Sequence, residues 1–187
     1  MRIIGGRFRG TRLAEVGAGD AAAHLRPTSD RVREAIFNLL INGGYGNPLD
    51  RARVLDLFAG TGALGLEALS RGAVQATFVE NGKAALALLA RNITLTRTAT
   101  MTDILRRDAT RPGPNPGVAY DLAFLDPPYG KSMGEAALSA ALAGGWLAQD
   151  ALVVWEEGVA PVLPQGVEPL DQRKYGDTIV TIAQVLA

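Results

Sequence analysis

Apolar residues recur along most of the chain at the spacings of helices and strands. From residue 31 they follow the three-to-four-residue period of an amphipathic helix that ends near Asn42. The segment 54–58 is short and mostly apolar, which predicts a buried strand. The same criteria predict further strands at 75–80, 104–108, 122–125 and 152–155 and further helices at 62–71, 83–92 and 136–143. Strands that alternate with helices indicate an α/β fold with a doubly wound parallel sheet.

Hairpins are predicted near both ends of the chain. Gly5-Gly6 is a favoured two-residue turn, so residues 2–13 are expected to form a short hairpin. Two more strands between Glu168 and Ile182 are predicted to join near Gly176-Asp177, at one edge of the sheet. Residues 14–24 lack a period, which indicates a loop. We therefore expect two parts, an N-terminal hairpin and loop at 1–24 and one α/β domain at 25–187.

Length and composition exclude several classes of function. The chain has 187 residues, the size of one ordinary domain, and its lack of cysteine excludes thiol nucleophiles and cysteine-ligated metal sites. A single histidine, His24, excludes a His-rich metal site, so we expect no metal and no catalytic role for His24. The apolar runs are too short to span a membrane, and arginines stand where a signal peptide would be apolar. The expectation is a soluble, cytoplasmic protein.

Positive charge is concentrated at the N-terminus. The chain as a whole has 19 basic and 19 acidic residues, so its net charge identifies no partner. Residues 2–12 contain four arginines and no acid; the arginines are Arg2, Arg7, Arg9 and Arg12. Such a segment can contact nucleic-acid phosphate. It can equally be a solvated hairpin whose arginines pair with nearby acids such as Glu15.

The first candidate site is the glycine-rich segment that runs from Asp56 through Gly60 and Gly62 to Gly65. It follows a strand and opens a helix, the context in which Gly-x-Gly-x-x-Gly binds a nucleotide-like cofactor at the carboxyl end of a sheet. A carboxylate at Asp56 would repel a pyrophosphate, whereas it would suit S-adenosylmethionine, which carries an ammonium and a sulfonium. The alternative is a tight turn without a ligand.

Two acids end the second and third predicted strands. Glu80 lies 24 residues after Asp56, where an acid in nucleotide-binding sheets accepts hydrogen bonds from ribose hydroxyls. Asp108 can accept a hydrogen bond from an adenine amino group. Simpler interpretations exist for both, because Glu80 can be a solvated strand end and Asp108 can pair with the neighbouring arginines at 106 and 107.

The most distinctive motif is Asp126-Pro127-Pro128-Tyr129, directly after the fourth predicted strand. Two prolines fix an extended turn without N–H donors, which leaves the carbonyl of Pro127 available as an acceptor. Asp126 adds a side-chain acceptor, and Tyr129 adds a flat aromatic face. This combination can hold the exocyclic amino group of a planar base. A purely structural turn is the alternative.

The glycine-rich segment and the Asp-Pro-Pro-Tyr turn together resemble class I S-adenosylmethionine-dependent amino methyltransferases. More narrowly, nearly the whole chain resembles the bacterial 16S ribosomal RNA guanine-N2 methyltransferase family known as RsmD. The matching segments are 2–10, 26–38, 55–65, 67–73, 126–129 and 174–178. The loops at 14–24 and 111–118 and the region before Asp108 depart most from the family. The resemblance implies a Rossmann-like sheet of seven strands, one of them antiparallel, with helices on both faces and an N-terminal hairpin.

The resemblance also implies roles for individual residues. Its implied contacts to S-adenosylmethionine are Arg26, Thr28, Asp56, Phe58, Gly60, Gly62, Glu80, Asn81, Asp108 and Asp126. In this assignment Gly60 and Gly62 line the methionine part, with Asp56 near its ammonium. Glu80 holds the ribose, and Asp108 the adenine edge. The segment from Arg26 to Thr28 would close over the methionine end, or is merely the entry to a helix.

Catalysis would take place at the Asp126–Tyr129 turn, whose four residues would hold a guanine. If Asp126 and the Pro127 carbonyl accept the two N–H groups of the guanine amine, the nitrogen lone pair can point at the methyl group, and positioning and electrostatics supply the acceleration. The implied partner is 16S rRNA in the assembled small ribosomal subunit, contacted by the N-terminal arginines. The family suggests a monomer without a metal.

Other functions share some of these features. A methyltransferase for adenine or cytosine of DNA or RNA would carry the same Asp-Pro-Pro-Tyr turn, and a substrate assay separates it from a guanine enzyme. A nicotinamide-dependent oxidoreductase would share the glycine turn, but Asp56 and the 126–129 turn argue against it. A non-catalytic RNA-binding module would bind no S-adenosylmethionine.

Overall fold

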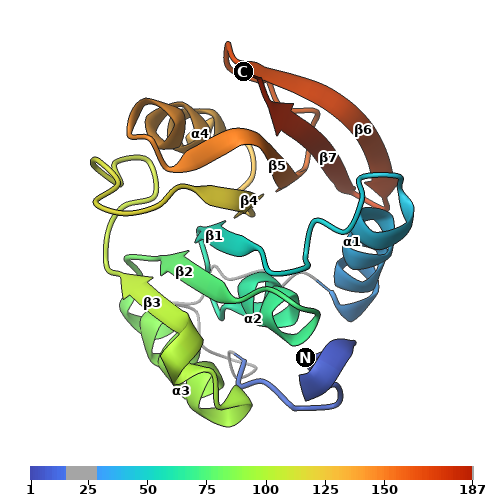
Figure 1. Cartoon of the computed structure of the whole chain (residues 1–187), viewed down its shortest axis with the longest axis vertical. Helices are drawn as coiled ribbons and strands as arrows, with labels where there is room; N and C mark the ends of the chain where they lie inside the picture. The colour runs from blue at the N-terminus through green and yellow to red at the C-terminus, as the bar shows by residue number, and fades with distance from the viewer. Residues whose placement is uncertain (16–28, 187) are drawn as a thin grey trace.

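The computed structural model describes residues 1–15 and 29–186. Arg26, Thr28 and His24 lie outside the described residues, as does most of the predicted loop at 14–24. Within the described part, one seven-stranded sheet has the order β3-β2-β1-β4-β5-β7-β6. The strands are β1 (Arg53–Leu57), β2 (Gln75–Val79), β3 (Thr102–Leu105), β4 (Tyr120–Leu125), β5 (Leu147–Glu157), β6 (Val167–Tyr175) and β7 (Thr178–Val185). The predicted α/β fold with a doubly wound sheet is confirmed (Figure 1).

One strand, β7, runs against the direction of the others. It pairs antiparallel with both β5 and β6, while the pairs among β1 to β5 are parallel. The single reversed strand therefore produces two antiparallel pairs. The predicted hairpin near Gly176-Asp177 is confirmed, since β6 and β7 are joined there and form one edge of the sheet.

Helices cover both faces of this sheet, and each face has its own core. The helices are α1 (Asp30–Asn42), α2 (Ala63–Ser70), α3 (Lys83–Thr96) and α4 (Met133–Ala143). Leu40, Leu66 and Leu89, from the first three helices, pack in one cluster with Phe78 and Phe124 of the sheet. On the opposite face, residues of α4 pack with Trp146, Trp155 and the alternate strand positions. None of the helices in the described residues is long and apolar enough to cross a membrane.

Local sequence explains where the first two helices begin. The Ser29 side chain accepts a hydrogen bond from the backbone N–H of Val32 at 3.2 Å and caps α1. The N-cap of α2 is Gly62, whose φ of 79° places it in the left-handed region that favours glycine. A side chain there would also collide with Leu89, because an added Cβ would lie 2.4 Å from its Cδ1.

The structure corrects two predicted elements. Residues near the N-terminus do pair antiparallel, through a bridge between Arg2 and Arg12, but the turn is not Gly5-Gly6. Gly6–Phe8 instead forms a short 3-10 helix, which widens the connection because its backbone packs against α2. The third strand ends at Leu105 rather than at Asp108. Leu105 is the last residue that pairs with β2, and residues 106–108 lie outside the strand.

The N-terminal segment is part of the core. Ile3 is fully buried and Leu13 is 5% exposed, and both belong to the cluster that packs against α1 and α2. Burial of two large aliphatic side chains contributes about 1.5–3 kcal/mol each. The segment is therefore held in place along α2.

Candidate active site

The sheet register brings the ends of three strands together at its carboxyl edge. Leu57 of β1 pairs with Val79 of β2 on one side and with Leu125 of β4 on the other. The residues that follow these strands, Phe58, Glu80 and Asp126, therefore begin three adjacent loops. The strand order reverses between β1 and β4, and ligands bind at such a reversal in open α/β sheets.

The glycine-rich turn after β1 has an unusual backbone. Phe58 has a φ of 62°, a left-handed conformation that costs a non-glycine residue about 1–3 kcal/mol and is concentrated at functional sites. Gly60 and Gly62 also have positive φ values, 56° and 79°. Gly65, the third glycine, lets α2 approach the sheet closely, because a Cβ there would lie 2.4 Å from the ring of Phe78.

Asp56 lies beneath this turn and is 1% exposed. Its Oδ2 accepts a hydrogen bond from the backbone N–H of Gly65 at 2.9 Å. Burial raises the pKa of Asp56 to about 8; the hydrogen bond from Gly65 opposes this shift, and the charge of Glu80 adds to it. At pH 7 the carboxyl is therefore mostly protonated. Its hydrogen bond to Gly65 makes Asp56 a support of the turn, and its role beside a ligand ammonium stays a prediction.

The raised pKa of Asp56 predicts a pH-dependent stability. The carboxyl has a pKa of about 3.9 in an unfolded chain, so between that value and about 8 the folded protein binds the extra proton. The free energy of unfolding should then fall as pH rises through this window, by up to about 1.4 kcal/mol per pH unit. Asp56→Asn lacks this titration. The free energy of unfolding of the variant minus that of the parent, both measured in urea, should therefore increase between about pH 5 and pH 8. A constant difference between the two proteins would show that Asp56 is ionised throughout.

Glu80 connects the glycine turn to the loop after β2. Its Oε2 accepts a hydrogen bond from the N–H of Gly60 at 2.9 Å, and its Oε1 accepts from the N–H groups of Asn81 at 2.9 Å and Gly82 at 2.7 Å. The side chain is half-buried. A merely solvated strand end does not describe this arrangement, because the carboxylate is fixed between two loops. Asn81 is exposed next to it.

Asp108 lies beyond the end of β3 and forms a local turn. Its Oδ1 accepts hydrogen bonds from the backbone N–H and the hydroxyl of Thr110, at 2.9 and 2.8 Å. These two bonds lower the pKa of Asp108. Arg107 donates to the carbonyl of Pro112. The role of Asp108 toward adenine stays a prediction.

The Asp126–Tyr129 turn follows β4 and faces the glycine turn across the reversal of strand order. Asp126 is half-buried, Pro127 is buried and Pro128 is exposed. Tyr129 is fixed at its far end, where its hydroxyl donates to Glu156 Oε1 at 3.1 Å and lies 3.1 Å from the hydroxyl of Thr178. Burial raises the pKa of Tyr129, so it remains a neutral phenol.

Two buried polar residues that the sequence analysis missed attach the N-terminal segment to this site. Asn92 of α3 is fully buried; its Oδ1 accepts from the N–H of Ala14 at 2.6 Å, and its Nδ2 donates to the carbonyls of Ala14 at 3.1 Å and Thr61 at 2.9 Å. Thr61 lies within the glycine turn. One amide therefore joins the N-terminal segment, α3 and the turn, although a lone Asn in a helix gives no signal of this in a sequence.

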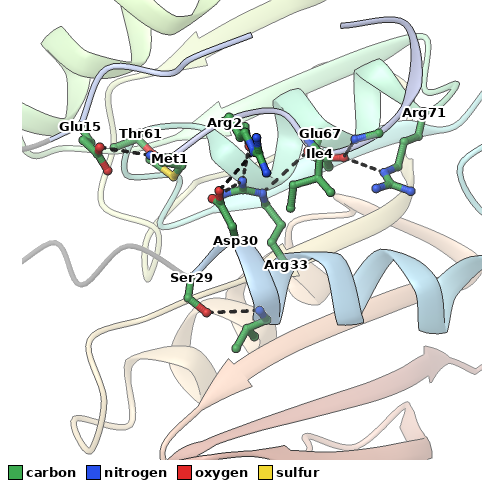
Figure 2. Close-up of polar contacts among 12 residues, drawn as sticks. Met1, Arg2, Ile4, Glu15, Ser29, Asp30, Arg33, Thr61, Glu67 and Arg71 are labelled. Carbon is green, nitrogen blue, oxygen red and sulfur yellow. Dashed lines mark hydrogen bonds and ion pairs between the residues drawn. The ribbon is translucent and has the colours of Figure 1, made fainter. Parts of the chain in front are cut away.

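Glu67 is the second of these residues and is also fully buried. It lies on α2 and accepts hydrogen bonds from the N–H groups of Ile4 and Gly5, both at 2.8 Å (Figure 2). Arg71 Nε donates to it at 2.7 Å, and Arg33 Nε lies 3.8 Å from its other oxygen. Glu67 thus connects the helix that opens the glycine turn to the N-terminal segment and α1.

The four N-terminal arginines are all exposed. Arg7 belongs to the 3-10 helix, and its guanidinium carbon lies 4.5 Å from the ring centroid of Phe8. Arg2 Nε lies 3.9 Å from Asp30, and Glu15 pairs with the N-terminal amine, 3.1 Å away, rather than with an arginine.

Comparisons with known proteins agree with this geometry. A family model described as Conserved hypothetical protein 95 matches residues 1–184. The Ribosomal RNA small subunit methyltransferase D of Escherichia coli K12 is 38% identical over 164 residues, which cover 88% of this chain and 78% of the relative. The solved structure of yhhF from Escherichia coli has a TM-score of 0.81 at 34% identity, covering 100% of this chain and 98% of that one. SMU.776, solved with SAH, shares the fold at a TM-score of 0.61 and 19% identity, over 82% of this chain and 49% of that one.

The sheet order, the glycine turn and the turn after β4 define a methyltransferase of class I fold. The chain belongs to the family described as Conserved hypothetical protein 95, and its resemblance to the RsmD methyltransferases is confirmed.

Proposed function

We propose that this protein transfers a methyl group from S-adenosylmethionine to the exocyclic N2 amine of a guanine in 16S rRNA of the small ribosomal subunit. The observation that carries the proposal is the register of β1 with β4, which pairs Leu57 with Leu125. It sets the glycine turn beside the Asp126–Tyr129 turn, so a methyl donor on one faces an amine acceptor on the other. The 38% identity to a ribosomal RNA small subunit methyltransferase supports the choice of RNA.

The residues at the carboxyl edge fit this cofactor. Glu80 presents a half-buried carboxylate, a suitable acceptor for paired ribose hydroxyls, and the glycine turn has no side chain at position 60 to obstruct a ligand. S-adenosylmethionine would supply an electrophilic methyl group on a sulfonium. Because Asp56 is buried, we infer that it acts through the turn by holding Gly65.

Asp126 and Pro127 would activate the amine by orientation. The lone pair of the guanine amine is delocalised into the ring, which makes it a weak nucleophile. When Asp126 and the Pro127 carbonyl accept its two N–H groups, the nitrogen can pyramidalise and its lone pair can point across to the methyl group. The methylated nitrogen is then acidic and loses its proton without a strong base. Glu156 and Thr178 hold Tyr129, which fixes the turn during this step.

Glu80→Ala should weaken the binding of S-adenosylmethionine by about 1.5–3 kcal/mol, the size of charge-assisted hydrogen bonds to two hydroxyls. The variant also loses the hydrogen bond to Gly60 that supports the turn. Isothermal titration calorimetry measures the change. Glu168→Ala, which removes an exposed acid of β6, is the matched control and should bind like the parent. Unchanged affinity in Glu80→Ala would remove Glu80 from the cofactor site.

The proposal is tested by methyl transfer from labelled S-adenosylmethionine to small ribosomal subunits that lack the modification, followed by identification of the methylated nucleoside. N2-methylguanosine is the expected product. A methylated adenosine or cytidine would overturn the assignment to guanine, and transfer only to DNA would overturn the assignment to RNA. Naked 16S rRNA, tested in parallel, shows whether assembly is needed.

A further inference from the structure

We propose that a groove between the N-terminal segment and α1 binds a backbone phosphate of the RNA substrate. The groove has a volume of about 380 Å³. Among the described residues that line it, three are arginines, Arg2, Arg9 and Arg71, and one is an acid, Glu34. This inference rests on the proposed function, because it assumes an RNA substrate, and it specifies which part of the surface contacts the RNA backbone.

Arg71 is already held in position for an anion. Its Nε donates to Glu67 at 2.7 Å, and its guanidinium carbon lies 5.1 Å from the ring centroid of Phe37. Gly5 packs against the same guanidinium so closely that a Cβ at Gly5 would lie 2.5 Å from Cζ. A planar guanidinium fixed in this way loses little side-chain entropy when it binds phosphate through its two terminal nitrogens.

The backbone of Arg2 is fixed as well. Arg33 is fully buried, donates to the carbonyl of Arg2 and pairs with Asp30 at 2.9 Å (Figure 2). The side chains of Arg2 and Arg9 are exposed on the groove side of this network. The lining therefore combines one rigid guanidinium with two adaptable ones.

Charge in the groove is positive after its acids are counted. Glu67 lies beneath it, but that carboxylate already accepts from Ile4, Gly5 and Arg71. Glu34 is the one acid among the described lining residues, and Asp30, outside the lining, lies 3.9 Å from Arg2 Nε, so two acids offset the three arginines. A concave site with net positive charge and a fixed guanidinium fits a phosphate better than it fits a neutral ligand.

The position of the groove predicts which step it affects. Arg71 is the C-cap of α2, whereas Gly62 is its N-cap beside the glycine turn. A helix of eight residues rises about 12 Å, so the two sites are separated by roughly that length. The groove would contact RNA outside the reacting nucleotide and should contribute to binding of the RNA, with no effect on affinity for S-adenosylmethionine.

The salt dependence of RNA binding tests the groove. Arg9→Ala removes one lining charge, and Arg91→Ala removes an exposed arginine on α3 outside the groove as the matched control. Each phosphate contact contributes about 0.7–0.9 to the slope of log affinity against log salt. Arg9→Ala should flatten this slope by about that amount, whereas Arg91→Ala should leave it unchanged. Equal slopes in Arg9→Ala and the parent would overturn the proposal.

Arg71→Lys separates binding from a structural role. Lysine keeps the positive charge, but its single ammonium cannot reproduce the planar guanidinium, whose Nε pairs with Glu67 while its two terminal nitrogens bind phosphate side by side. We expect roughly three- to tenfold weaker RNA binding, as one charge-assisted hydrogen bond is lost, with unchanged affinity for S-adenosylmethionine. A purely structural Arg71 would lower the melting temperature and leave RNA affinity intact, which would overturn its assigned role.

A direct titration identifies the ligand. Amide shifts of Gly5 and Gly10, which line the groove, are recorded while single-stranded RNA, inorganic phosphate or an acidic peptide is added. Shifts with RNA and phosphate support the proposal. Shifts with phosphate alone, or with the peptide alone, would overturn it in favour of a small anion or a protein partner. If subunits are methylated but Arg9→Ala and Arg71→Lys bind RNA like the parent, only the proposal for the groove fails. If no nucleic acid is methylated, the proposed function itself fails.

Discussion

Asp126→Ala is expected to lower turnover about 100-fold or more while affinity for S-adenosylmethionine stays within about tenfold, because a positioning acceptor of this kind contributes roughly 3 kcal/mol to the transition state. The side chain follows β4 at the reversal of strand order, beside the glycine turn, and its loss would leave the amine held by the Pro127 carbonyl alone. Single-turnover methylation of small subunits measures the rate, and calorimetry measures the cofactor.

Two further variants make this experiment decisive. Asp177→Ala removes an exposed aspartate in the turn between β6 and β7, and should behave like the parent in both measurements. Asp126→Asn keeps one carbonyl acceptor and should fall between the parent and Asp126→Ala. Turnover of Asp126→Ala within about tenfold of the parent would be too small a loss for an acceptor that orients the amine.

Glu67→Ala is expected to destabilise the fold by about 3–5 kcal/mol, the typical result of removing one partner from a buried ion pair. The substitution leaves the N–H groups of Ile4 and Gly5 and the buried guanidinium of Arg33 without their carboxylate. Burial lowers the pKa of Arg33, and the charge of Glu67 opposes this shift. The free-energy cost of keeping the Arg33 guanidinium charged in the core therefore rises when Glu67 is lost. Urea denaturation measures the change.

The exposed acid Glu34 of α1 provides the comparison, and Glu34→Ala should change the free energy of unfolding by less than about 0.5 kcal/mol. Glu67→Gln keeps the shape and one acceptor oxygen, so it should recover part of the stability lost in Glu67→Ala. A change of less than about 1 kcal/mol in Glu67→Ala would mean that water replaces the carboxylate and that the N-terminal segment is not anchored through it.

Periodicity predicted most of the fold because the elements are strongly patterned. The buried strands β1, β2 and β4 and the helix α1 follow spacings that local sequence determines. The boundaries of β5 were less predictable, since Leu147–Glu157 extends well beyond its apolar centre. The N-terminal turn was placed wrongly because its form depends on contacts with α2, which no local pattern records.

The candidate site was predictable where a motif follows a strand and not where a contact is tertiary. The glycine turn, Glu80 and Asp126 lie at strand ends, so their meeting follows from topology. The state of Asp56 was not predictable, because only the packed structure shows that it is 1% exposed. Asn92 and Glu67 were missed for a similar reason. Each is a single polar residue within a helix, and its partner in the N-terminal segment lies more than sixty positions away in the chain.

The hydroxyl of Thr178, which holds Tyr129, belongs to a strand that is synthesised long after the turn it supports. Tyr129 and Thr178 are 49 positions apart, and their hydroxyls can meet only when β7 has paired with β5. During translation the chain emerges from its N-terminus, so the glycine turn and β4 leave the ribosome before this strand exists. The half of the molecule that would hold the methyl donor can therefore form early. The half that would hold the base is complete only when the final hairpin has joined the edge of the sheet.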